Sequence, residues 1–102
     1  GFQEQDTSRV VFDTPEGRII EVIAKGAQDP GAVYDYYQLV LPSLSWQIDS
    51  ATPKNRSLLK ECRKTAAFCI IALLDRERLM IRISQEKSGS GQTVIAFFLD
   101  PQ

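Results

Sequence analysis

The chain has 102 residues, with 12 Lys and Arg against 13 Asp and Glu, 43% hydrophobic residues, two cysteines and no histidine. This length suits one domain with its own core. A net charge of −1 gives no broad positive field, so a nucleic-acid partner held through its phosphates is not expected. Without histidine the chain can build neither a Ser-His-Asp nor a Cys-His site, and two cysteines cannot complete a four-thiolate zinc site. No catalytic residue, metal ligand or cofactor is therefore assigned.

The start of the chain bears on its cellular location. It begins at Gly1, and its only methionine is Met80, which is typical of a trimmed chain. A removed signal peptide or lipoprotein leader is the favoured explanation, and a disordered native leader is the other. Residues 1–8 are expected to be a disordered leader or a cloning remnant, and residues 9–102 a single domain. The expected location is the periplasm or another site outside the cytoplasm, with the cytoplasm as the alternative.

No transmembrane segment is predicted. The longest apolar run, Ala66 to Leu74, is far shorter than the roughly 18 residues that a membrane-spanning helix needs.

Alternating side chains predict strands toward both ends of the chain. Residues 9–12 and 18–25 are expected to form a β-hairpin, because Thr14-Pro15-Glu16-Gly17 suits a type I turn. Residues 78–84 alternate apolar with polar side chains, and residues 93–99 form a last strand.

A helix is predicted from Pro30 to Leu41. Asp29 can cap its free N–H groups, and Pro30 suits its first turn. Apolar side chains then recur at helical spacing, and Pro42 is expected to end the helix. Residues 44–48 are expected to be an extended segment that seats Trp46 against this helix.

The segment from residue 51 to residue 74 is ambiguous. Its apolar side chains from Leu58 to Leu73 fall on about a third of a helical wheel, which favours a helix. Residues 68–74, however, are apolar on every face and are typical of a buried strand. We expect a helix over about residues 56–66 followed by a strand, with a strand over 56–66 as the alternative. The elements together predict an α+β domain: an antiparallel sheet of four to six strands with one or two helices packed on one face.

Three groups of residues resemble a pattern found in a family of small bacterial cell-envelope proteins of unknown function. They are Phe12-x-x-Pro15-x-Gly17-Arg18-Ile19 at the start, Tyr36-Tyr37-x-x-x-Leu41-Pro42-x-Leu44-x-Trp46 in the middle, and Arg76-Glu77-Arg78-Leu79 with Phe98-Leu99-Asp100-Pro101 at the end. Residues 50–72 have no clear counterpart. The resemblance implies an α+β domain that carries a signal peptide, and it implies no activity and no catalytic residues.

The two cysteines have two interpretations. On a continuous helix the α-carbons of Cys62 and Cys69 would be about 10 Å apart, beyond the roughly 7 Å that a disulfide allows. If the chain instead turns between them at residues 64–67, a disulfide becomes possible. Two buried free thiols are the alternative.

Two groups of side chains are candidates for contact with a partner. Tyr34 and Tyr36, with Tyr37 and Trp46, could form an aromatic patch, although packing between helix and sheet is the simpler interpretation. A basic cluster could bind an anionic ligand, although a solvated helix face is the simpler interpretation. This cluster consists of Lys54, Arg56, Lys60, Arg63 and Lys64.

The leading hypothesis is a non-enzymatic binding or interaction module outside the cytoplasm, which contacts another envelope protein or a small ligand. The alternative is a small enzyme that uses carboxylate and tyrosine acid–base groups in a pocket between helix and sheet. The two differ in whether Trp46, Ile81 and Phe97 fill the space under the helix or leave it open. A third possibility is a chain whose exposed strand edge pairs with a partner.

Overall fold

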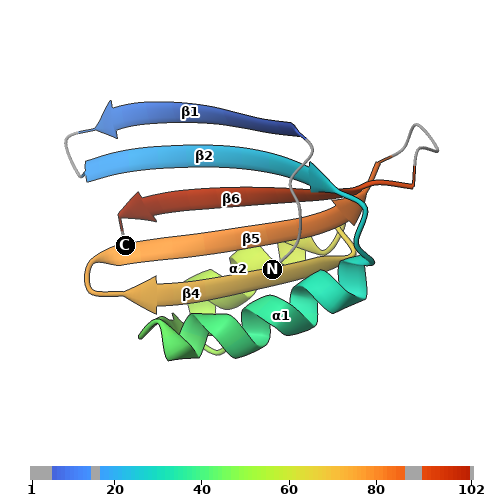
Figure 1. Cartoon of the computed structure of the whole chain (residues 1–102). Helices are drawn as coiled ribbons and strands as arrows, with labels where there is room; N and C mark the ends of the chain where they lie inside the picture. The colour runs from blue at the N-terminus through green and yellow to red at the C-terminus, as the bar shows by residue number, and fades with distance from the viewer. Residues whose placement is uncertain (1–5, 15–16, 87–90, 102) are drawn as a thin grey trace.

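The sheet is antiparallel, and its six strands are joined to two helices (Figure 1). A computed structural model describes residues 6–14, 17–86 and 91–101 of the chain. The strand order is β1-β2-β6-β5-β4-β3. The α+β class and the antiparallel sheet of four to six strands are therefore confirmed. The elements are β1 (Asp6–Thr14), β2 (Gly17–Gly26), α1 (Pro30–Ser43), β3 (Gln47–Ile48), α2 (Pro53–Cys62), β4 (Phe68–Leu74), β5 (Glu77–Gln85) and β6 (Thr93–Pro101).

The predicted β-hairpin is formed by β1 and β2, which pair from Asp6 opposite Lys25 to Thr14 opposite Gly17. The two residues of its turn, 15 and 16, lie outside the described residues. Because β1 begins at Asp6, residues 6–8 belong to the strand and not to the leader expected over residues 1–8. Residues 1–5 also lie outside the described residues.

Helix α1 begins as predicted and ends later than predicted. The Asp29 carboxylate accepts a hydrogen bond from the Ala32 N–H at 3.2 Å, and Pro30 opens the first turn. The helix continues through Pro42 to Ser43, although a proline inside a helix has no N–H to donate to the carbonyl four residues earlier. Ser45 has φ +71°, its N–H donates to the Pro42 carbonyl, and the Trp46 N–H donates to the Leu41 carbonyl. The left-handed conformation of Ser45 and these two hydrogen bonds form a Schellman motif. This motif ends the helix and turns the chain so that Trp46 packs beneath it.

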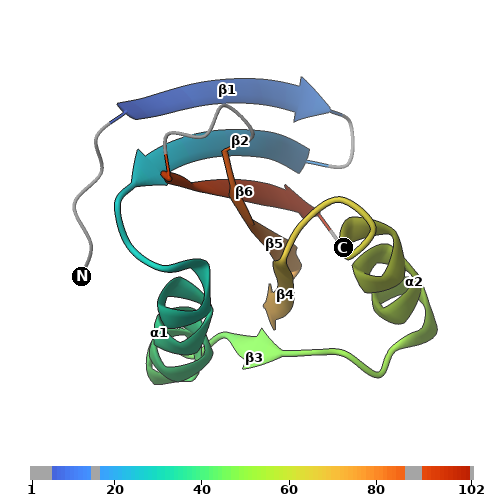
Figure 2. The same ribbon diagram turned by 90° about the vertical axis from the view of Figure 1, so that its right-hand side faces the viewer.

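The two helices lie on opposite sides of β4 (Figure 2). Val33 and Leu41 of α1 pack with Ile70 and with Ile81, and other members of this cluster come from β4, β5 and β6. Helix α2 packs through Leu59 and Cys62 on a separate cluster that contains Cys69 and Ile71. Successive residues of a strand face opposite sides of the sheet, so neighbouring β4 residues are buried by different helices. One helix thus covers one face as expected, whereas the second covers the other face instead of sharing the first.

The space between α1 and the sheet is filled by side chains. Ile81 is 1% exposed at the centre of the α1 cluster. Trp46 and Phe97 are partly buried against the same cluster. These three side chains therefore fill the interface between α1 and the sheet.

The ambiguous segment is a helix followed by a strand. Helix α2 begins and ends earlier than the expected range 56–66, and Ala66 lies in the turn that follows it. This turn begins at Arg63, and the N–H groups of Thr65 and Ala66 both donate to the Cys62 carbonyl. Neither α1 nor α2, the helices of the described chain, is long and apolar enough to cross a membrane.

Candidate functional site

Three basic side chains line one open hollow on the outer face of α2. Arg56, Lys60 and Arg63 follow one another at spacings of four and three residues, which place them on the same helix face. All three are exposed. The hollow has a volume of about 610 Å³, and Pro53 and Ser57 complete its lining. We call it the basic hollow.

The cations of the basic hollow have no acidic partner within the described residues. Like charges four residues apart on a helix repel one another, so Arg56 and Lys60 weaken α2 locally. Lys60 and Arg63 gain a little from the negative end of the helix dipole, but Arg56 is too far from that end to do so. The face therefore carries positive charge that the described part of the chain does not neutralise.

The other two basic candidates lie elsewhere. Lys64 donates to Glu61 across 3.0 Å on the surface, and it does not line the hollow. Lys54 is exposed but is also absent from the lining. Of the five predicted basic residues, Arg56, Lys60 and Arg63 therefore line the hollow.

The candidate tyrosines belong to α1, on the opposite face of the sheet. Tyr34 stacks on Phe68 with ring centroids 4.9 Å apart. Tyr36 is 41% exposed and meets Tyr37 edge to face, and Tyr37 meets Phe97 in the same way. Tyr36, Tyr37 and Phe97 thus form one series of ring contacts that starts at the surface, and Tyr34 and Phe68 form a separate pair. In each set a ring of α1 packs on a ring of the sheet, as in the simpler interpretation.

A second, smaller space lies where β4 has no neighbouring strand, and we call it the edge cavity. Its volume is about 190 Å³. Arg63 lines it as well as the basic hollow, and Tyr34 reaches it from α1. Two of the predicted candidates therefore meet here, although they come from opposite faces of the sheet. The rest of the lining consists of Gln38, Ile48, Asp49, Ser50, Leu59, Cys69, Ile70 and Ile71.

Asp49 organises the chain between β3 and α2. One carboxylate oxygen accepts from Asn55 Nδ2 at 2.8 Å, and the other accepts from the N–H groups of Ala51 and Thr52. Asn55 is a polar residue that is only 4% exposed. The hydrogen bonds from the side chains of Asn55 and Thr52, followed by those from the backbone, lower the pKa of Asp49 from 3.8 to about 2.

This lowered pKa predicts an acid-sensitive contribution to stability. Since the folded state favours the ionised carboxylate, the contribution is fully present above the usual pKa near 3.8 and is lost as the pH falls toward about 2. In urea unfolding over this range, the stability difference between the wild type and Asp49→Asn should shrink as the pH falls. A difference that stays constant between pH 5 and 2 contradicts the assignment.

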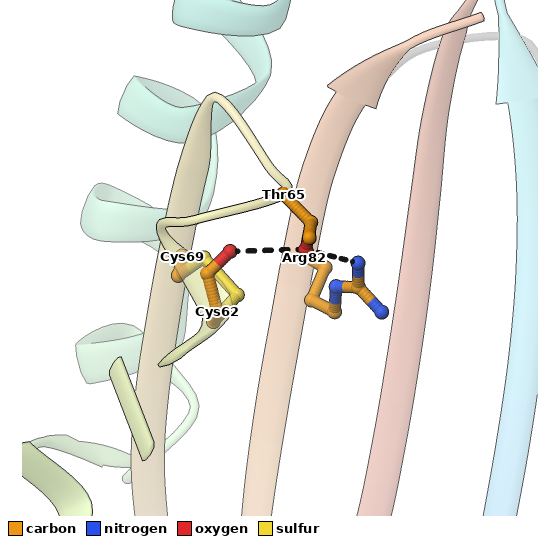
Figure 3. The surroundings of a disulfide bond; sticks show 4 residues. All are labelled: Cys62, Thr65, Cys69 and Arg82. Atoms are coloured by element: carbon orange, nitrogen blue, oxygen red, sulfur yellow. Dashed lines mark hydrogen bonds between the residues drawn. A yellow bond between two sulfur atoms is a disulfide. The ribbon is translucent and has the colours of Figure 1, made fainter. Parts of the chain in front are cut away.

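A disulfide joins the end of α2 to the start of β4 (Figure 3). The α-carbons of Cys62 and Cys69 are 6.4 Å apart, because the chain turns between them and the helix does not continue. Beside the disulfide, Arg82 of β5 donates to the Thr65 hydroxyl at 2.8 Å, and that hydroxyl donates to the Cys62 carbonyl. The turn that carries Arg63 is thus tied to two strands.

Sequence reasoning missed Asp49 and Gln38. The signal for Asp49 was present, since an aspartate side chain in a turn commonly accepts a hydrogen bond from the backbone N–H two residues later, as it does here from Ala51. Gln38 carried no signal, because only the tertiary structure places it at the edge cavity.

No family model matches the chain, and neither a curated protein nor a solved structure matches it.

Proposed function

We propose that this chain is a non-enzymatic binding module outside the cytoplasm, which contacts an acidic segment of another envelope protein through the basic hollow. The observation that carries this proposal is the row of Arg56, Lys60 and Arg63 without acidic partners in the described chain. A carboxylate or other anion placed there would relieve their mutual repulsion.

Three further features support the location and the non-enzymatic role. Disulfides persist in oxidising compartments, so the Cys62–Cys69 disulfide favours a location outside the cytoplasm. The resemblance to cell-envelope proteins points the same way. The filled interface beneath α1 supports binding in preference to catalysis.

The test uses adjacent charge reversals. A fluorescent polyglutamate peptide should bind Arg63→Glu about tenfold more weakly than wild type, and should bind Lys64→Glu almost as well as wild type. Both variants change the net charge equally, but only Arg63 lines the hollow. Fluorescence anisotropy at low salt measures both affinities, and added salt should weaken the wild-type complex.

Equal weakening by the two substitutions would mean that overall charge, and not the basic hollow, attracts the peptide. If wild type binds inorganic phosphate but not polyglutamate, the site takes small anions and the proposed protein partner is wrong. Absence of binding to either probe overturns the proposal altogether.

A further inference from the structure

The outer edge of β4 is only partly paired. Strand β3 lies opposite Leu73 and Ala72, and the Asp49 N–H donates to the Ile71 carbonyl at 2.9 Å. The chain then leaves the sheet at Ser50 to begin α2. Beyond Ile71, toward its N-terminal end, β4 has no neighbour on this side within the described chain.

The free part of the edge presents backbone hydrogen-bonding groups. In an antiparallel strand both backbone groups of a residue point to the same neighbour, and residues two apart point the same way. Since the Ile71 carbonyl faces β3, the N–H and C=O of Cys69 face the same side. Neither group has a backbone partner there among the described residues. Buried backbone groups require a partner, and because Cys69 is only 3% exposed, a partner would reach its backbone by way of the edge cavity that Cys69 lines.

The edge cavity lies at this part of β4. Cys69, Ile70 and Ile71 line it from β4, Tyr34 and Gln38 from α1, and Leu59 and Arg63 from α2. Because the helices cover opposite faces of β4, they flank its edge on both sides (Figure 2). The plane of the sheet passes between them, and an added strand would lie in that plane about 4.8 Å from β4.

We infer that the acidic segment binds here as a short added strand, with its backbone paired to Cys69 and an acidic side chain on Arg63. Strand addition draws affinity from main-chain hydrogen bonds and specificity from side-chain contacts. Arg63 lines both spaces, so a segment paired at the edge can continue along Arg56 and Lys60. The Asp49 carboxylate, the acidic group of the cavity lining, is already engaged by Asn55 and by backbone N–H groups. This inference rests on the proposed function, because it assigns the conformation of the same partner.

The first test fills the edge cavity without changing its charge. Gln38→Trp should weaken binding of a peptide of alternating valine and glutamate by about tenfold. Leu39→Trp is the matched control, because Leu39 is the next residue of α1, is 78% exposed and does not line the cavity. It should leave binding unchanged. Wild-type affinity in Gln38→Trp would overturn the inference.

The second test examines the backbone of the peptide. One version is N-methylated at every valine and another at every glutamate, so that each blocks the donors of one strand edge. Exactly one of the two should lose binding by about tenfold or more. The unmodified peptide should also slow hydrogen exchange of the Cys69 amide.

The outcomes separate this inference from the proposed function. If both methylated peptides bind as well as the parent, charge alone holds the segment: strand addition is wrong and the proposed function stands. If the peptide slows hydrogen exchange in β1, at the opposite edge of the sheet, instead of at Cys69, the inference is also overturned. If neither the alternating peptide nor polyglutamate binds wild type, both proposals fail.

Discussion

Alanine substitution of either Ile70 or Ile71 is expected to lower the free energy of unfolding by about 2–5 kcal/mol. The two residues are consecutive in β4 and are 2% and 1% exposed. Ile70 packs in the cluster beneath α1, and Ile71 packs in the cluster beneath α2. Each substitution therefore leaves a cavity under a different helix. A sheet covered on one face would show a large loss for only one of them.

Urea unfolding measures both losses against a surface control. Leu39→Ala also shortens an aliphatic side chain, but Leu39 is 78% exposed, so its effect should stay within about 0.5 kcal/mol. If an alanine variant does not fold, Ile70→Val and Ile71→Val should each cost about 0.5–1.5 kcal/mol. A negligible loss at Ile71 would contradict the placement of α2 on the second face.

Reduction of the Cys62–Cys69 disulfide is expected to destabilise the protein by about 2.5 kcal/mol. This figure follows from the loop entropy released in the unfolded chain, for cysteines with a sequence separation of 7. The melting temperature should fall by roughly 10 °C for a domain of this size. Comparing oxidised with dithiothreitol-reduced protein keeps every side chain in place, so that only the covalent link changes.

The consequences of reduction should concentrate on α2. Beyond the disulfide and its Arg82–Thr65 neighbours, α2 is held on β4 mainly by the small cluster around Leu59. Amide hydrogen exchange in α2 should therefore accelerate more than in α1, which packs on several strands. Unchanged unfolding and unchanged exchange in α2 would show that the disulfide adds nothing to the fold.

Local patterns were enough to predict most of the fold. The alternation of Leu79, Ile81 and Ile83 predicts a strand with one apolar face, and these side chains belong to the α1 cluster. Asp29 and Pro30 predict the start of α1 because capping depends on adjacent residues alone. The late end of α1 was missed because Pro42 was expected to end the helix, and because Ser45, and not a glycine, adopts the left-handed conformation that follows the true end.

The segment before and within β4 was ambiguous for a physical reason. A strand buried on both faces is apolar at every position, so Cys69, Ile70 and Leu73 also fit a helical stripe. The turn between α2 and β4 contains neither glycine nor proline and is closed instead by bonds to the Cys62 carbonyl. Nothing local therefore marks the boundary.

Of the candidate site, only the row of positive charges could be predicted from the sequence. The spacing of Arg56, Lys60 and Arg63 places them on one helix face without any tertiary information. The edge cavity depends on where β3 ends and on the two helices lying on opposite faces of β4, and neither follows from a local pattern. Its discovery required the assembled sheet.

Chemical-shift mapping with polyglutamate tests the central claim most directly. In ¹⁵N-labelled protein, the largest amide shifts on titration should fall on α2, the turn after it at Arg63, and β4 from Cys69 to Ile71. Lys25 and Arg78 are basic residues paired with Glu86 and Asp100, and should shift little. Shifts spread over all basic residues, or largest away from α2, would contradict the proposal that the basic hollow is the binding site.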